Sequence, residues 1–174
     1  MFKEDTESAN SFKKYVFDKK EFTLAELVKM LDANFEGYEY VRRKLLSDRD
    51  KYGNNKDLPD SFVIDITDFL SKYVCGRPNA KKRGGKWDIG FHVARMSYIQ
   101  GEKTAASPNG RLLGEELSKN ASASMGQNRE GVTAAILSNT KIDLSRIYGN
   151  ATLDVAFLPS SVKGEDGLEA MYAL

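Results

Sequence analysis

The sequence predicts an α/β fold that is mostly helical, with a few strands. Apolar residues recur at helical spacing through the first half of the chain, which favours helices there. Two short runs in the second half, 91–100 and 154–158, lack glycine and proline and have the composition of strands. We therefore expect one domain in three parts: a helical segment over 1–75, a basic Gly-rich connection over 76–89, and a strand, loop, helix and strand over 90–174.

Three helices are expected in the helical segment. Thr23 and Glu26 form a T-x-x-E capping box that opens a helix over 24–33. A second helix is expected over 38–46 and a third over 59–74. The side chains expected to be buried are, on the first helix, Leu24, Leu27, Val28 and Leu31 and, on the third, Phe62, Ile66, Phe69, Leu70 and Tyr73.

The helical segment offers few reactive side chains. Asp65 and Asp68 lie opposite the apolar face of the third helix, and solvated charges are favoured over catalytic acids, which would need burial. One cysteine and one histidine form neither an intramolecular disulfide nor a zinc site, so no metal is predicted. For Cys75 an unreactive thiol is favoured over a reactive one, because reactivity requires a depressed pKa.

The charge balance argues against several kinds of partner. The 26 Lys and Arg residues are interspersed with 25 Asp and Glu residues, which makes no case for nucleic acid or an anionic membrane. No apolar run is long enough to span a membrane and residues 1–20 are charged throughout, so the expected location is cytoplasmic. The basic run 77–86 before Trp87 is expected to be an exposed connection rather than a phosphate or nucleic-acid contact, because no second aromatic is present to stack a base.

The expected strand 91–100 has one polar face. Because side chains alternate along a strand, this face would carry His92, Ala94, Met96, Tyr98 and Gln100. Such a face could line a polar cavity or lie half-exposed against other elements. Downstream, Pro108 fixes φ and Asn109 and Gly110 tolerate positive φ, so a tight turn is expected that leaves Arg111 in a defined position.

The remaining elements are simpler. The stretch 117–128 is rich in Ser, Ala, Asn and Gly, a composition typical of a flexible linker, and a helix with small residues follows over 131–140. Asp166 is expected to cap a last helix in which Leu168, Met171 and Tyr172 are spaced for burial. The chain then stops without a C-terminal helix signal, so we expect it to be part of a longer one.

Two long patterns carry a resemblance to a known family. They are GEKTAASPNGRLLGEELSKN followed by GQNREGVTAAILSNTKID, and, upstream, FTLAELVKMLDANFEGYEYVRRKLLSDRDKYGNN. Together they resemble the glycyl radical enzymes, which include pyruvate formate-lyases and several lyases, dehydratases and decarboxylases. The resemblance extends from about Phe12 to the end of the chain.

The resemblance implies a fold and a chemistry. The fold would be part of a ten-stranded β/α barrel, over which the family has an ordered loop at 117–128. The larger enzyme would act on a small organic substrate by radical C–C, C–N or C–O cleavage, as a formate acetyltransferase-like transferase, a lyase or a dehydratase. It would be a homodimer whose glycyl radical is installed by a separate activating enzyme that uses S-adenosylmethionine and an iron–sulfur cluster.

The chain lacks both radical residues that the resemblance requires. It contains no R-V-x-G-[YF] sequence, and its only cysteine, Cys75, is not in the position of the thiyl cysteine, so no catalytic residue is assigned and the chain alone is expected to be inactive. The alternatives are a non-enzymatic module that docks on a full-length homologue or its activating enzyme, and an anion-binding protein that uses Arg111 and the run 77–83.

The resemblance also suggests which residues face a substrate. The position before Gly101 carries a polar or aromatic substrate-facing group in some members, and here it is Gln100, with Tyr98 and His92 on the same expected face. The alternative is that this face packs against a helix. The turn residues Pro108, Asn109, Gly110 and Arg111 are expected to be structural, with Arg111 bonded to backbone carbonyls or a carboxylate.

Overall fold

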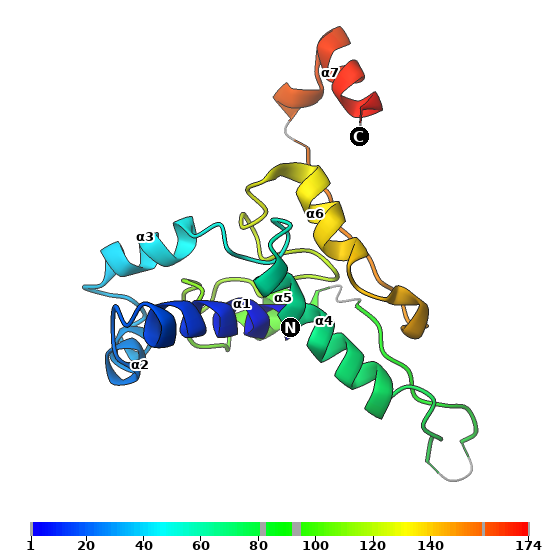
Figure 1. The fold of residues 1–174 in the computed structure, drawn as a ribbon, viewed down its shortest axis with the longest axis horizontal. Helices are drawn as coiled ribbons and strands as arrows, with labels where there is room; N and C mark the ends of the chain where they lie inside the picture. The colour runs from blue at the N-terminus through cyan, green and yellow to red at the C-terminus, as the bar shows by residue number, and fades with distance from the viewer. Residues whose placement is uncertain (1, 81–82, 92–94, 158, 174) are drawn as a thin grey trace.

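The computed structural model describes residues 2–80, 83–91, 95–157 and 159–173 and is mostly helical (Figure 1). The α-helices are α1 Phe2–Phe12, α2 Leu24–Asp32, α3 Glu39–Ser47, α4 Asp57–Tyr73, α5 Met96–Gly101, α6 Gly131–Thr140 and α7 Gly164–Tyr172. A π-helical turn, η1 Lys13–Asp18, continues α1, and two 3₁₀ turns follow α6, η2 Leu144–Arg146 and η3 Pro159–Val162. Among the described residues there is no β-strand, only two isolated bridges.

The helices with clear sequence signals are confirmed. α2 begins at the capping box, in which the Glu26 amide donates to Thr23 Oγ1 at 3.2 Å and the Thr23 amide donates to Glu26 Oε2 at 2.7 Å. α3, α4 and α6 lie within two residues of their predicted bounds. Local capping and periodicity therefore suffice to locate these helices.

The buried face predicted for α2 is confirmed only in part, and that predicted for α4 is wrong. On α2, Leu27 is buried and Leu31 is partly buried, as predicted, but Leu24 and Val28 are about half exposed and Met30 is buried in their place. On α4, Phe69 and Tyr73 are exposed, and the buried residues are Pro59, Asp60, Val63, Thr67 and Ser71. The reason for α4 is α1, a helix that the sequence did not predict, which packs against it and buries its own Thr6, Glu7 and Asn10.

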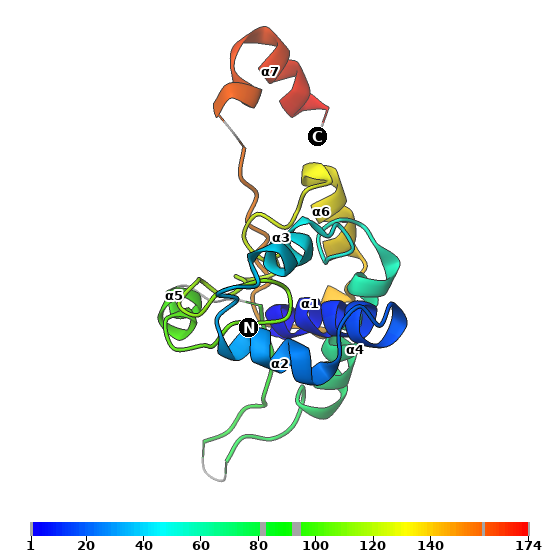
Figure 2. The same cartoon turned by 90° about the vertical axis from the view of Figure 1, so that its left-hand side faces the viewer.

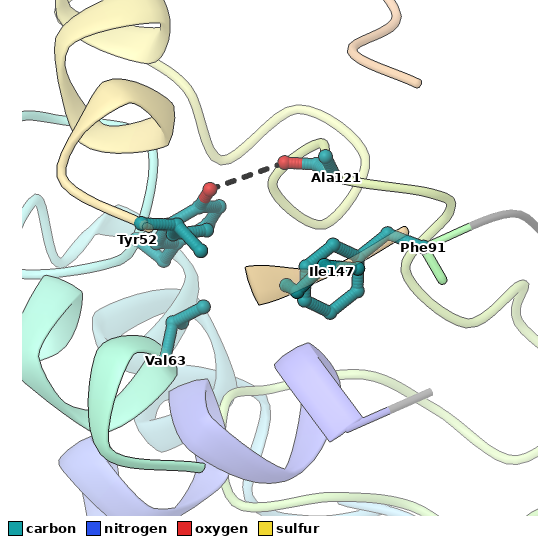
Figure 3. Close-up of a cluster of buried hydrophobic side chains, with 6 residues drawn as sticks. Tyr52, Val63, Phe91, Ala121 and Ile147 are labelled. Atoms are coloured by element: carbon teal, nitrogen blue, oxygen red, sulfur yellow. Dashed lines mark hydrogen bonds between the residues drawn. The ribbon is translucent and has the colours of Figure 1, made fainter. Parts of the chain in front are cut away.

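Two small apolar clusters hold the elements together. The first consists of Tyr52, Val63, Phe91, Ala121, Ile142 and Ile147 and gathers residues from across the chain (Figure 3). Within it the Tyr52 hydroxyl donates to the Ala121 carbonyl at 3.2 Å. The second cluster, Tyr15, Met30, Phe35 and Leu45, joins η1, α2 and α3. Both clusters join segments distant in the sequence, so they anchor the loops between the helices.

The strand predicted over 91–100 is wrong for the residues that the structure describes. Only Phe91 pairs, through a parallel bridge to Ala151, and 96–101 form helix α5; residues 92–94 lie outside the described part. The helix brings Ser97 and Gly101 onto one face, about one turn apart. A strand would separate these two residues by roughly 13 Å, too far for both to contact the segment 115–117 as they do.

The strand predicted over 154–158 is also absent from its described residues, 154–157. This segment is extended but has no strand beside it. It contacts the stretch 117–128: the Asp154 amide donates to Ser122 Oγ at 2.8 Å, and Asn120 Nδ2 donates to Asp154 Oδ2 at 2.7 Å. An extended chain becomes a strand only by pairing its backbone, and here side chains make the contacts.

The stretch 117–128 is ordered, not the flexible linker that its composition suggests. Leu117, Ala121, Ser124 and Gln127 are all buried. The family-based expectation of an ordered loop is the one that the structure supports. Hereafter this stretch is called the polar loop.

The last helix is set apart from the rest of the molecule. α7 begins at Gly164, two residues before the predicted cap Asp166, and it contacts η3 (Figures 1 and 2). Leu168, Met171 and Tyr172 are 58%, 50% and 86% exposed, so the predicted burial is not found. None of the helices in the described ranges is both long and apolar enough to cross a membrane.

Candidate functional site

The turn at 107–111 is the centre of a buried polar network. Gly110 has φ +99°, as the predicted tight turn requires, and its amide donates to the Ser107 carbonyl at 2.9 Å. Asn109 Oδ1 accepts from Ser107 Oγ at 2.8 Å and from the Arg111 amide at 3.2 Å. The Asn109 side chain therefore closes the turn from inside.

Two buried charged side chains, those of Lys51 and Glu7, also form hydrogen bonds with Asn109. Lys51 Nζ donates to the Asn109 carbonyl at 2.9 Å and to Gln127 Oε1 at 2.8 Å. The Glu7 carboxylate accepts from Asn109 Nδ2 at 3.3 Å and from the Ser124 amide at 3.1 Å. Both Lys51 and Glu7 are fully buried. The Asn109 network, as it is called below, consists of Glu7, Lys51, Asn109, Ser124 and Gln127. It links α1, the segment after α3, the turn and the polar loop.

Arg111 is engaged with backbone carbonyls, as the sequence led us to expect. Its NH1 donates to the carbonyls of Leu112 at 2.8 Å and Glu115 at 3.0 Å, and its NH2 donates to those of Thr104 and Ala105. The side chain is buried. A guanidinium that donates to four carbonyls stabilises the loop around it and is not presented to an anion.

The sequence KYGNN, residues 51–55, meets the polar loop along its length. Asn54 Nδ2 donates to the Gln127 carbonyl at 2.8 Å, and Asn54 Oδ1 accepts from the Glu130 amide at 3.0 Å. Gly53 has φ +88°, and a Cβ placed on it would lie 2.7 Å from Ala123 Cβ. The two stretches that carry the family resemblance thus pack against each other with no room for a further methyl group.

An open cleft of about 430 Å³ lies over this network. Its lining includes Arg42, Arg111, Glu115 and Arg129. The cations are already engaged: Arg42 donates to the Gly110 carbonyl and to Glu115, and Arg129 Nε donates to the Gly126 carbonyl. This arrangement holds a loop in position, and the side chains named here do not form a general acid and general base pair for catalysis.

The candidate substrate-facing residues lie elsewhere. Tyr98, half exposed, and Gln100 are on helix α5, so the alternation that grouped them with His92 does not apply, and His92 itself lies outside the described residues. Ser97 Oγ donates to Glu116 Oε1 at 2.9 Å, and the Leu117 amide donates to the Ser97 carbonyl at 3.3 Å. The structure therefore brings α5 against the start of the polar loop, but not into the Asn109 network.

Gly101→Ala tests this helical packing. An added Cβ would lie 2.5 Å from the Glu115 carbonyl oxygen, and such overpacking costs about 1–3 kcal/mol. Alanine gains about 1 kcal/mol of helix propensity, so we expect a net loss of about 1 kcal/mol in the free energy of unfolding, measured by urea denaturation. A stabilised variant would show that α5 does not pack on residue 115.

Cys75 is an ordinary thiol. Its Sγ donates to Asp88 Oδ1 at 3.3 Å. Burial and this hydrogen bond raise the pKa of the thiol above its usual value, so the basic residues nearby do not activate it. Within the described part of the chain, no group of three or more His, Cys, Asp or Glu side chains is placed to hold a metal ion.

Sequence reasoning missed Glu7 and Lys51. Lys51 was visible as the first residue of KYGNN, but nothing in its spacing indicated a buried ammonium group. Glu7 belongs to α1, whose sequence FKEDTESANSF contains few apolar residues. A buried polar helix has no simple sequence signature, because its partners come from distant segments.

Comparison with known proteins identifies the protein family. The model of the pyruvate formate lyase-like family matches residues 6–97, and the chain belongs to this family of glycyl radical enzymes. It spans about a fifth of the length of the curated relatives that it matches.

Two relatives and two solved structures show which members of the family this chain is similar to. The chain is 38% identical over 166 residues to trans-4-hydroxy-L-proline dehydratase of Clostridioides difficile, covering 95% of this chain and 21% of the relative. It is 36% identical to isethionate sulfite-lyase of Nitratidesulfovibrio vulgaris, with coverage of 95% and 20%. The crystal structure of the Clostridioides difficile hydroxyproline dehydratase with its substrate bound superposes with a TM-score of 0.86 at 38% identity, over 97% of this chain and 21% of that one. A glycyl radical enzyme from Archaeoglobus fulgidus gives 0.81 at 30% identity, over 97% and 21%.

Proposed function

We propose that this chain supplies part of the catalytic barrel of a glycyl radical lyase or dehydratase that eliminates a leaving group from a small organic substrate. The observation that carries the proposal is the similarity in sequence and structure to hydroxyproline dehydratase over nearly the whole of this chain. The relatives named above are a dehydratase and a lyase, which favours elimination over acyl transfer. The ten-stranded barrel, the homodimer and the cytoplasmic location belong to the same proposal.

The chemistry would come from residues that this chain lacks. The glycyl radical of the larger enzyme, installed by its activating enzyme, would start the reaction. The role of this chain would be to position loops. The Asn109 network and the four hydrogen bonds from Arg111 to carbonyls hold the turn and the polar loop in one arrangement. Fixed loops matter here because a misplacement of about 1 Å near the reacting atoms costs roughly a hundredfold in rate.

Gln100 and Tyr98 stay in this proposal as substrate-side groups, together with His92. On helix α5, Tyr98 is half exposed and Gln100 is partly exposed, so both are accessible to a ligand. A neutral amide such as Gln100 serves as a hydrogen-bond donor or acceptor and not as a general base. The role proposed for it is to orient the substrate.

A segment exchange tests the proposal. This chain would replace the aligned segment of trans-4-hydroxy-L-proline dehydratase of Clostridioides difficile, and the chimera would be treated with the activating enzyme of that dehydratase. We expect a glycyl radical signal in electron paramagnetic resonance and turnover within about a hundredfold of the unaltered enzyme. A folded chimera that forms no radical would contradict the proposal.

Two variants of the chimera separate orientation from folding. Gln100→Ala should lower turnover far more than stability, whereas Ile99→Ala, one residue away on α5 and exposed, should change both only slightly. Equal effects would remove Gln100 from the site. The alternative, a docking module, would be supported if the chimera is inactive while the isolated chain binds an intact family member in a pull-down.

A further inference from the structure

The turn at 107–111 contains the only Asn-Gly sequence of the chain, Asn109-Gly110. Asparagine is among the chemically least stable residues. It is most labile before glycine, because glycine has no side chain to hinder the approach of its backbone nitrogen to the asparagine side chain. The turn therefore places a reactive dipeptide at the centre of the Asn109 network.

The reaction of such a dipeptide needs only water. The backbone nitrogen of Gly110 loses its proton to hydroxide and bonds to Cγ of Asn109. The bond from Cγ to Nδ2 breaks, and Nδ2 leaves as ammonia with a proton taken from water. Water then opens the resulting succinimide ring at either of its carbonyl carbons. The products are aspartate and isoaspartate, and nothing is oxidised or reduced.

The folded structure blocks this reaction at both reacting atoms. The Gly110 amide donates to the Ser107 carbonyl at 2.9 Å, and Gly110 is buried, so hydroxide does not reach its nitrogen. Asn109 is only 3% exposed. Hydrogen bonds fix its side chain at both ends, since Oδ1 accepts from the Arg111 amide and Nδ2 donates to Glu7. The dipeptide is therefore reactive only while the turn is open.

We propose that Asn109 is a modification site that its own network protects, and that loss of its side-chain amide as ammonia releases the polar loop. The rate of modification follows the fraction of time that the network is open. The buried ammonium group of Lys51 keeps this fraction small, because it donates to the Asn109 carbonyl and to Gln127 Oε1. Any change that loosens the network therefore becomes irreversible with time.

Both products lack Nδ2, the group through which Asn109 donates to Glu7 Oε2. In aspartate a carboxylate oxygen replaces Nδ2, which lies 3.3 Å from the buried Glu7 carboxylate, and two like charges so close repel each other. Isoaspartate adds one carbon to the backbone of the turn and so disturbs the bond between Gly110 and Ser107. Because the Glu7 carboxylate also accepts from the Ser124 amide, its displacement frees the polar loop.

Mass spectrometry of the tryptic peptide 104–111 measures the modification in the whole chain kept in mildly alkaline buffer. The wild type should be modified at least about a hundredfold more slowly than a synthetic peptide of the same sequence, which has no fold to protect it. Lys51→Met should be modified at least about tenfold faster than the wild type. Lys29→Met, an exposed control on α2, should keep the wild-type rate. A wild type as fast as the peptide, or Lys51→Met no faster than the wild type, would overturn the protection.

Two variants test the release of the polar loop. Asn109→Asp supplies the aspartate product in every molecule and should speed hydrogen exchange of the Ser124 amide at least about tenfold. Adding Glu7→Gln should restore slow exchange, because the glutamine nitrogen donates to the new carboxylate while its oxygen still accepts from Ser124. An unchanged rate in Asn109→Asp, or no recovery in the double variant, would refute release through Glu7. Neither result depends on the proposed catalytic role, which the segment exchange tests.

Discussion

Replacing Lys51 by methionine is expected to lower the free energy of unfolding by about 3–5 kcal/mol. The ammonium group is fully buried and supplies hydrogen bonds to the Asn109 carbonyl and to Gln127 Oε1. Methionine fills similar space but donates nothing, so both acceptors stay buried without this donor, and the Glu7 carboxylate loses the positive charge on the far side of Asn109. Urea denaturation followed by circular dichroism measures the loss.

The same variant should also release the polar loop. The Ser124 amide, which donates to Glu7 Oε1 at 3.1 Å, should exchange its hydrogen faster than in the wild type. Lys103→Met is the matched control, because Lys103 is exposed, and its effect should stay within about 0.5 kcal/mol. Equal effects of the two substitutions would show that Lys51 is not a member of the network.

A double-mutant cycle with Glu7→Gln measures the coupling through Asn109. If the two buried charges act as a pair, the double variant should be more stable than the sum of the single losses indicates, by at least about 1 kcal/mol. Additive losses would mean that Lys51 and Glu7 stabilise the turn and the polar loop independently.

Gly53→Ala is expected to lower the free energy of unfolding by about 2–4 kcal/mol, from a backbone cost and a packing cost. The residue has φ +88°, a region that alanine enters at a cost of about 1 kcal/mol. The added Cβ would also lie 2.7 Å from Ala123 Cβ, and relief of that overlap requires KYGNN and the polar loop to separate, at about 1–3 kcal/mol. Thermal or urea unfolding reports the sum.

Gly131→Ala separates the two costs. Gly131 has the same φ, +88°, but nothing lies within 4 Å of an added Cβ, so only the backbone cost of about 1 kcal/mol should appear there. In addition, Ala123→Gly combined with Gly53→Ala should recover part of the loss, because it removes the methyl group in conflict. If Gly53→Ala costs no more than Gly131→Ala, the two segments are not in close contact.

For the site, the sequence predicted the turn and its residues but not what holds them. Pro108, Asn109 and Gly110 encode the turn by their own φ preferences, and Arg111 leaves it as expected. The sequence could not assign Glu7 and Lys51 to the site, because lysine and glutamate side chains are nearly always exposed. A buried charge is stable only when hydrogen-bond partners compensate for the loss of water. Those partners, Asn109, Ser124 and Gln127, lie between 58 and 117 residues away along the chain.

For the fold, the sequence by itself determined the helices whose ends and stripes are local. The capping box of α2, the acidic first turn of α4 and the glycine that opens α6 each act within a few residues, so no tertiary contact is needed to place them. The long spaced patterns likewise determined the family. The tertiary structure decided which face of α4 is buried, since α1 covers its polar side, and made 96–101 a helix, since only a helix brings Ser97 and Gly101 together against 115–117. Such choices depend on contacts between distant segments, whose free energy exceeds the small local preferences of a short run such as MSYIQG.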